Sequence, residues 1–185
     1  MISMAFLYEY IPFLIIIEYI SICIYYTNRF TLISDRAYKL VIGNVLMTEV
    51  IYYLYMKYIA VEYQDLKTNI VNFIILPVVL DTYFYLIHRL AHAKFYYIHK
   101  DHHEYYNTIC SWHLSHLDHL ITNIGCMTLP LLLFPLDKAF SNIAIMFIMW
   151  NSMQAHSDVG GSHWIHHRDL NRRYGSFMDK FFGTM

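Results

Sequence analysis

The sequence predicts an all-α integral membrane bundle of about four or five membrane helices with a cytosolic, histidine-rich helical cap. Of its 185 residues, 57% are hydrophobic and 15% are charged, whereas soluble domains carry about 25% charged residues. Several apolar runs reach the length of a membrane span. All twelve histidines lie between His88 and His167. We expect one domain over residues 1–185, with N-terminal membrane helices in 1–68 and a core in 69–185.

Three apolar runs in the first half predict three membrane helices. The first covers residues 4–26, and it lacks the basic start and small-residue cleavage site of a signal peptide, so we expect it to be retained. The second covers residues 39–61. The third covers residues 69–88 and leads directly into the first histidine motif. Each run reaches the roughly 20 residues that a spanning helix needs.

A fourth apolar run, residues 120–154, is too long for one helix. Pro130, Pro135 and the pair Asp137 and Lys138 predict a break, and hence a hairpin of two short helices. With the N-terminus outside, most basic residues that flank the runs fall on the cytosolic side, as membrane proteins prefer. Lys57 and Lys67 fall on the other side.

The overall composition excludes other classes of protein. The formal net charge is −1, so the chain has no basic footprint for nucleic acid. The three cysteines, Cys23, Cys110 and Cys126, form no CxxC pattern. A disulfide framework or a zinc ribbon is therefore not expected.

The histidines occur in motifs with helical spacing: HRLAH from residue 88, HKDHH from residue 99 and HWIHH from residue 163. Positions i, i+3 and i+4 share one helix face, and a hairpin that enters and leaves at one membrane surface returns the last motif to the first two. With one further histidine after the hairpin, nine imidazoles can converge. They are His88, His92, His99, His102, His103, His156, His163, His166 and His167.

Nine ligands suit two metal ions better than one, because one ion takes three to six. Imidazole binds zinc, copper, iron and nickel. The surplus of neutral nitrogen donors without a thiolate favours a pair of irons, although spacing alone does not separate iron from zinc.

The order of these motifs resembles the fatty acid hydroxylase/sterol desaturase superfamily of membrane di-iron enzymes. The resemblance extends to Asp81-x-x-x-Tyr85-x-x-His88-Arg89 before the first motif and to His156-Ser157-Asp158 before the last. It also includes YGSFMDKFFGT at residues 174–184, and it covers roughly residues 75–185.

The resemblance implies a lipid oxygenase with two iron ions, for which zinc can substitute, held by the nine histidines. It implies dioxygen as co-substrate and electrons from NAD(P)H through cytochrome b5 and its reductase or an equivalent donor. The substrate would be a fatty acyl chain or a sterol, reached from the membrane. In a eukaryote, the location would be the endoplasmic reticulum with the active site facing the cytosol. HKDHHE resembles 4-methyl sterol oxidases and related hydroxylases more than acyl-CoA desaturases.

Four further residues are candidates for supporting the metal ligands. Asp81 lies two helical turns before His88 and can orient an imidazole or simply pack between helices. Asp118, in SHLDHL, stands where the family has the Glu of His-Pro-x-Glu, and Tyr174 lies in Arg-Tyr-Gly where the family has Asn-Tyr-Gly. His116 is the fourth. Together with His113 and His119 it is spaced i, i+3, i+6, and whether any of these three binds metal stays open.

Three alternatives to the hydroxylase remain. The first is a lipid or sterol desaturase of the same superfamily. The second is a metal-binding membrane protein without redox chemistry, such as a zinc carrier, which would need ligands near the middle of the membrane. The third is a non-enzymatic assembly partner, against which the complete motifs argue. The particular lipid and the oligomeric state are open.

Overall fold

The computed structural model describes residues 34–105, 111–157 and 162–185. All regular elements in these ranges are helices, as predicted, and one isolated parallel bridge joins Val61 to Asp137. The membrane span predicted at residues 4–26 lies outside the described residues. The same is true of Cys110 and Asp158.

The two long helices begin at capping side chains. Helix α2, Asp35–Tyr58, starts after Ser34, whose hydroxyl accepts a hydrogen bond from the Ala37 N–H. Helix α3, Leu66–Lys94, starts after Asp65, which accepts one from the Thr68 N–H. At 29 residues, α3 is about 43 Å long, longer than the roughly 30 Å apolar core of a bilayer. Its last turns can therefore project beyond the apolar layer.

The predicted hairpin is present. Its first arm changes from α-helix to π-helix and back, and its second arm is a single α-helix. The first arm consists of α5, His116–Asp118, the π-helical η4, His119–Ile124, and α6, Gly125–Leu133. The second arm is α7, Lys138–Ala155, capped by the Asp137 carboxylate. The chain turns between residues 133 and 138, as Pro135 and Asp137 indicate. Pro130, in contrast, lies inside α6.

Among the helices that the structure describes, only α3 is long and apolar enough to cross a membrane. Its exposed side chains include Ile70, Ile74 and Val78, which is the outer surface a lipid-facing helix needs. Helix α2 overlaps the span predicted at residues 39–61 and the hairpin overlaps residues 120–154, but neither meets the same test. Four or five spans, and the orientation in the membrane, thus stay predictions.

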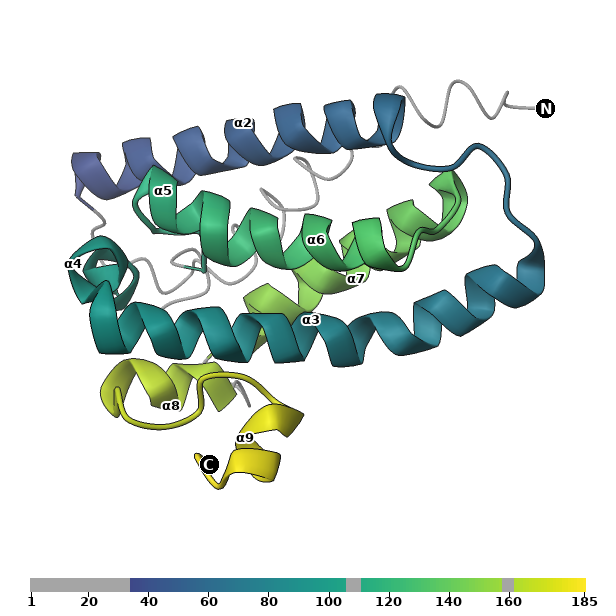
Figure 1. Ribbon diagram of the computed structural model, residues 1–185. Coiled ribbons are helices and arrows are strands. Elements are labelled where there is room, and N and C mark those ends of the chain that lie inside the picture. The colour runs from purple at the N-terminus through teal and green to yellow at the C-terminus, as the bar shows by residue number, and fades with distance from the viewer. Residues whose placement is uncertain (1–33, 106–110, 158–161) are drawn as a thin grey trace.

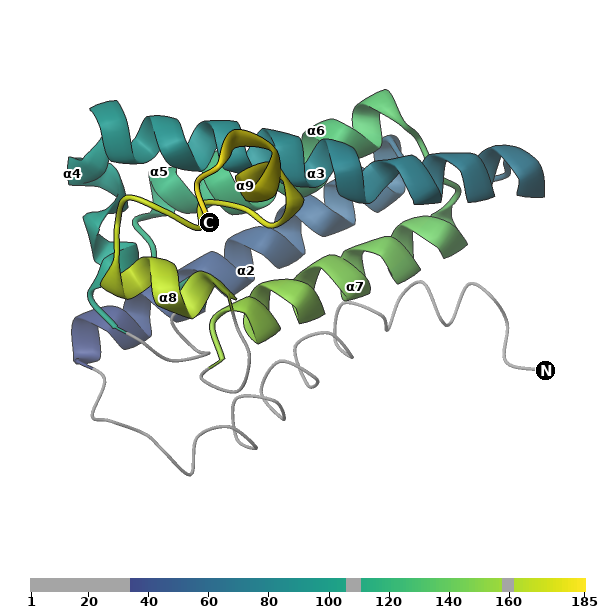
Figure 2. The same cartoon turned by 90° about the horizontal axis from the view of Figure 1, so that it is seen from below.

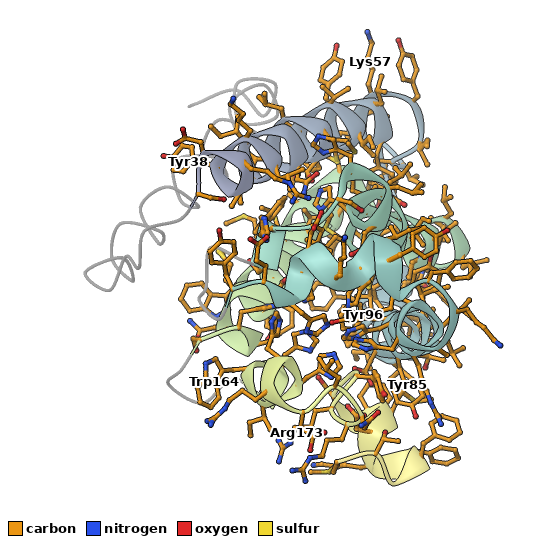
Figure 3. The ribbon with its side chains drawn as sticks, turned by 90° about the vertical axis from the view of Figure 1, so that its left-hand side faces the viewer. Tyr38, Lys57, Tyr85, Tyr96, Trp164 and Arg173 are labelled. Atoms are coloured by element: carbon orange, nitrogen blue, oxygen red, sulfur yellow. The ribbon has the colours of Figure 1, made fainter. Side chains whose placement is uncertain are left out.

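Four helices lie along the long axis of the molecule, namely α2, α3, α6 and α7 (Figures 1 and 2). Short elements gather at the end where α3 and α7 finish. These are α4, Tyr96–His99, the 3-10 helix η2, Lys100–His103, and α8, Ser162–Arg168. Helix α9, Phe177–Phe182, packs on α3 near the C-terminus. In Figure 3, Lys57 of α2 and Arg173 near the C-terminus lie at opposite edges.

A buried amide attaches α2 to the segment that leads into α5. Asn44 has no exposed surface, and its Nδ2 donates to the carbonyls of Trp112 and Leu114, both at 2.9 Å. Its Oδ1 lies 2.7 Å from His116 Nδ1. One turn further along α2, Thr48 Oγ1 lies 2.8 Å from His119 Nε2. These polar contacts fix the start of the hairpin arm against α2.

We expect Asn44→Ala to lower the free energy of unfolding by about 2 kcal/mol, because two buried carbonyls lose their donor. The measurement is thermal or denaturant unfolding of the purified protein in detergent. Asn151→Ala is the control, since that amide is exposed and donates only to Phe147 of its own helix; we expect a change below about 0.5 kcal/mol. Equal effects of the two substitutions would contradict the anchoring role of Asn44.

Candidate metal centre

The structure brings all nine predicted histidines together at one end of the bundle. Two of them lie in the last turns of α3, and three lie on α4 and η2. One follows the last residue of α7, and three lie on α8. Their ligand atoms form two groups, within each of which all atoms lie within 4.8 Å of one another. The five-histidine group is His88, His92, His99, His103 and His166; the four-histidine group is His102, His156, His163 and His167.

The nitrogen–nitrogen distances match ligands around one ion in each group. In the five-histidine group, His92 Nε2 lies 3.1 Å from His103 Nε2 and 2.9 Å from His166 Nε2. In the other group, His102 Nε2 lies 3.2 Å from His163 Nε2 and 3.3 Å from His156 Nε2. With metal–nitrogen bonds of about 2.1 Å, adjacent ligands lie about 3.0 Å apart in an octahedron and about 3.4 Å apart in a tetrahedron. Each group is therefore the right size for one metal ion.

Backbone carbonyls determine which ring nitrogen can bind a metal. The Nδ1 atoms of His88, His156 and His166 each lie 2.7 Å from a carbonyl oxygen. Because a carbonyl only accepts, each Nδ1 must carry the proton, and a neutral ring then has its lone pair on Nε2. A hydrogen bond of this kind on the second nitrogen is typical of metal-binding histidines.

A carboxylate has the same effect on a fourth ring. His99 Nδ1 lies 2.8 Å from Asp118 Oδ2, and both side chains are 3% exposed. The Nε2 atoms of His99 and His88 are buried without a hydrogen-bond partner. A buried polar atom left unpaired is costly, and a metal ion in the five-histidine group would remove that cost for both.

Burial favours the neutral form of eight of the nine imidazoles by lowering their pKa. It lowers the pKa of His156 and of His166 to about 4, from an ordinary value of 6.5. Burial and the neighbouring imidazoles lower the pKa of His102 and of His163 well below that ordinary value. At neutral pH these rings therefore present lone pairs, as metal ligands must.

The two groups share segments and lie side by side. His102 and His103 are adjacent in the chain but belong to different groups, since successive residues of a 3-10 helix are turned by about 120°. On α8, His163 and His167 face one group while His166 faces the other. The rings of His103 and His167, one from each group, have centroids 4.7 Å apart. The arrangement fits a pair of neighbouring ions.

The supporting residues predicted from the sequence divide into two sets. Asp118 contacts His99, and Tyr174 reaches His88 through its backbone carbonyl rather than its phenol. Asp81, which the sequence suggested as a residue that orients an imidazole, has two backbone partners in the C-terminal segment. Its carboxylate oxygens accept the N–H groups of Ser176, at 2.7 Å, and Met178, at 2.9 Å, so it holds the C-terminal segment.

The three ambiguous histidines belong to neither group. His116 is partly exposed and bonded to Asn44, and His119 is bonded to Thr48. His113 is buried, with Nε2 3.8 Å from Glu104 Oε2. Two of the three therefore attach the hairpin arm to α2, a role that their spacing of three residues does not reveal.

A tight turn near the C-terminus, which sequence reasoning missed, supports two histidines of the five-histidine group. Arg173 has a φ of 61°, in the left-handed region, and the carbonyls on either side of it, from Arg172 and Tyr174, accept from His166 and His88. Asp179 holds the turn by accepting the N–H of Tyr174 at 3.0 Å. The sequence did offer one signal for this turn. Arg173 stands where the resembled family has the Asn of Asn-Tyr-Gly, and Asn adopts the left-handed conformation readily.

A cavity of about 530 Å³ leads to the four-histidine group. It lies between α3, α6 and α7, and residues 175–177 complete its wall. His156 and His163 border it, whereas no member of the five-histidine group does. Much of the wall is apolar, including Leu80, Met127 and Ile148. Such a cavity suits an apolar ligand, and no motif in the sequence indicates it.

Comparison with known proteins agrees with this geometry. The family model described as Fatty acid hydroxylase matches residues 73–184, more than half of the chain, close to the core expected at 69–185. No curated protein and no solved structure matches the chain. The chain therefore belongs to the fatty acid hydroxylase family, which makes it in general an oxidoreductase of lipid metabolism that is associated with a membrane.

We expect Arg173→Asn to raise the free energy of unfolding by about 0.5–1 kcal/mol, because Asn tolerates the left-handed conformation. Arg173→Val should lower it by more than about 1 kcal/mol and reduce metal content, because a β-branched residue strains the turn that holds His88 and His166. Unfolding in detergent and metal analysis test both variants. If the Val variant keeps full stability and metal, the turn does not support the ligands.

We expect the metal-free protein to lose stability as the pH falls from about 6.5 to about 4. The unfolded chain binds protons on its histidines near 6.5, whereas burial lowers the pKa of His156 and His166 in the folded chain to about 4. Above about pH 7 all these rings are neutral in both states, so the stability is level there. Unfolding of metal-free protein at about pH 8 and about pH 5 measures the difference; equal stability would show that the rings are not buried and neutral.

Proposed function

We propose that this member of the fatty acid hydroxylase family is a membrane-bound di-iron oxygenase that hydroxylates or oxidises a C–H bond of a lipid. The substrate would be a fatty acyl chain or a sterol, with dioxygen as oxidant and electrons from outside. The observation that carries the proposal is a cavity with a largely apolar wall, bordered by two histidines of the four-histidine group, next to which the five-histidine group lies.

The donor set suits two irons. Every group member is an imidazole, which binds iron, zinc and copper, and neither group includes a thiolate or a carboxylate. Four ligands leave two positions of an octahedron free, and five leave one. Iron bound at these groups would supply the one-electron chemistry that activates dioxygen, which protein side chains lack. Zinc can occupy the same nitrogens but does not change its oxidation state.

The protein itself would place the substrate. The cavity between α3, α6 and α7 would receive an apolar chain. His156 and His163 lie where that chain ends. In the overall reaction, one oxygen atom enters the C–H bond and the other leaves as water, with two electrons and two protons taken up.

Exposed basic residues near the ligands favour the proposal that the electron donor is an acidic protein. Arg89, Lys94, Lys100 and Arg168 are exposed on or beside the elements that carry the ligands. In this proposal, the four basic residues attract an acidic partner, and NAD(P)H electrons arrive through cytochrome b5 and its reductase or an equivalent donor. With that surface in the cytosol, the protein would lie in the endoplasmic reticulum membrane of a eukaryote.

Hydroxylation is favoured over desaturation by the HKDHHE motif at residues 99–104. Both reactions begin by removing hydrogen from an unactivated carbon, so the products decide between them. Hydroxylation adds one oxygen to the lipid, and desaturation removes two hydrogens. A non-redox zinc carrier is disfavoured because the groups lie at the end of the bundle, and not midway along α3.

We expect the purified protein to hold two irons per chain and to add oxygen to a lipid when supplied with NAD(P)H, a reductase and dioxygen. His103→Ala should lose iron and all product, because His103 belongs to the five-histidine group. His116→Ala is the matched control on a nearby segment, since that ring contacts Asn44 and belongs to neither group. Metal analysis and lipid mass spectrometry provide the two measurements.

Two outcomes would overturn the proposal. Equal iron content in the two variants would show that the groups do not hold the metal. Two bound irons without any change in lipid mass, under reducing and oxygenated conditions, would point to a metal-binding protein without oxygenase activity.

A further inference from the structure

One aromatic ring in the cavity wall packs against a histidine of each group. Phe84 lines the cavity, and its ring centroid lies 5.0 Å from that of His88 and 6.0 Å from that of His163. His88 belongs to the five-histidine group and His163 to the four-histidine group. A ligand that fills the cavity therefore meets Phe84 as it approaches the metal centre.

The ring screens one group more than the other. From the cavity, His156 and His163 are directly accessible, whereas His88 is fully buried and does not border it. Phe84 precedes His88 by one helical turn on α3, so the two side chains share a face of that helix. The five-histidine group consequently lies behind Phe84, and the four-histidine group lies beside it.

We propose that Phe84 determines which carbon of the substrate is oxidised, by closing the inner end of the cavity and stopping a bound apolar chain beside His156 and His163. This inference rests on the proposed function, because it assumes that an apolar chain occupies the cavity. The chain advances until it contacts the ring, so the size of the residue at position 84 sets how far it reaches.

The cavity offers a matched control at its other end. Phe147 also lines it, on α7, and its side chain is more than half exposed. It lies nine residues before His156, about 13 Å along the helix. Phe147→Ala removes the same atoms from the same cavity as Phe84→Ala, but far from the imidazoles. It should change entry of the chain and leave its end point unchanged.

Trp112 provides a binding signal that does not require turnover. It is 3% exposed and lines the cavity, and the chain has only two other tryptophans. In a Trp150→Phe, Trp164→Phe background, palmitic acid brominated at successive carbons should quench Trp112 fluorescence most strongly at one position. The zinc-loaded protein in detergent is the sample, with unbrominated palmitic acid as the reference.

We expect Phe84→Ala to move the most effective bromine position by at least one carbon, and Phe147→Ala to leave it where it is. Phe84→Leu, a smaller change, should move it in the same direction and provides a second test if the Ala variant loses metal. In the iron-loaded enzyme, the ratio of products at neighbouring carbons should change roughly tenfold or more, the usual discrimination for one methylene in an apolar pocket.

The outcomes separate this inference from the proposed function. Position-dependent quenching that is identical in the parent protein and both Phe84 variants would overturn the role of Phe84 while leaving a lipid in the cavity. No quenching by any brominated palmitic acid, with no oxygenated lipid product, would overturn the lipid oxygenase itself. Equal shifts in the Phe84 and Phe147 variants would show that cavity volume, and not the ring at the inner end, sets the position.

Discussion

Nine imidazoles packed into one end of a helical bundle impose the constraint on which the rest of this structure depends. A buried ring nitrogen without a partner is costly, and here several Nε2 atoms point at one another across about 3 Å. Two metal ions would turn these contacts into bonds. The Nε2 atoms are left available for metal ions if the groups that hold the rings contact only Nδ1. Backbone carbonyls and the Asp118 carboxylate do this.

The C-terminal segment connects this metal centre to the cavity. Asp81 on α3 accepts two of its N–H groups, and Asp179 holds the turn at Arg173, whose neighbours orient His166 and His88. Gly175 packs so closely on α3 that a Cβ atom there would lie 3.1 Å from Asp81 Oδ1. The same stretch completes the cavity wall. Displacing it would therefore alter ligand orientation and substrate position together.

Helix α3 combines three environments on two faces, because Leu80, Phe84 and His88 follow one another at a spacing of four residues. One face is exposed and apolar along Ile70, Ile74 and Val78, one lines the cavity through Leu80 and Phe84, and its last turns carry ligands. A helix can do this because side chains project around its full circumference while each face repeats every three or four residues. The length of α3 separates the exposed apolar side chains of its first half from the two histidines of its last turns.

The helical fold, the break in the hairpin and the convergence of nine histidines could be predicted from local sequence, because helical spacing and chain breakers are properties of a few neighbouring residues. The assignment of each ring to one group required the three-dimensional contacts, since His102 and His103 are identical in type and differ only in direction. The tertiary structure also assigned Asp81 to the C-terminal turn, His116 to Asn44 and Phe84 to the cavity. These contacts join positions far apart in the chain, such as His88 and Tyr174, and several use backbone carbonyls, which every residue possesses and no motif can mark.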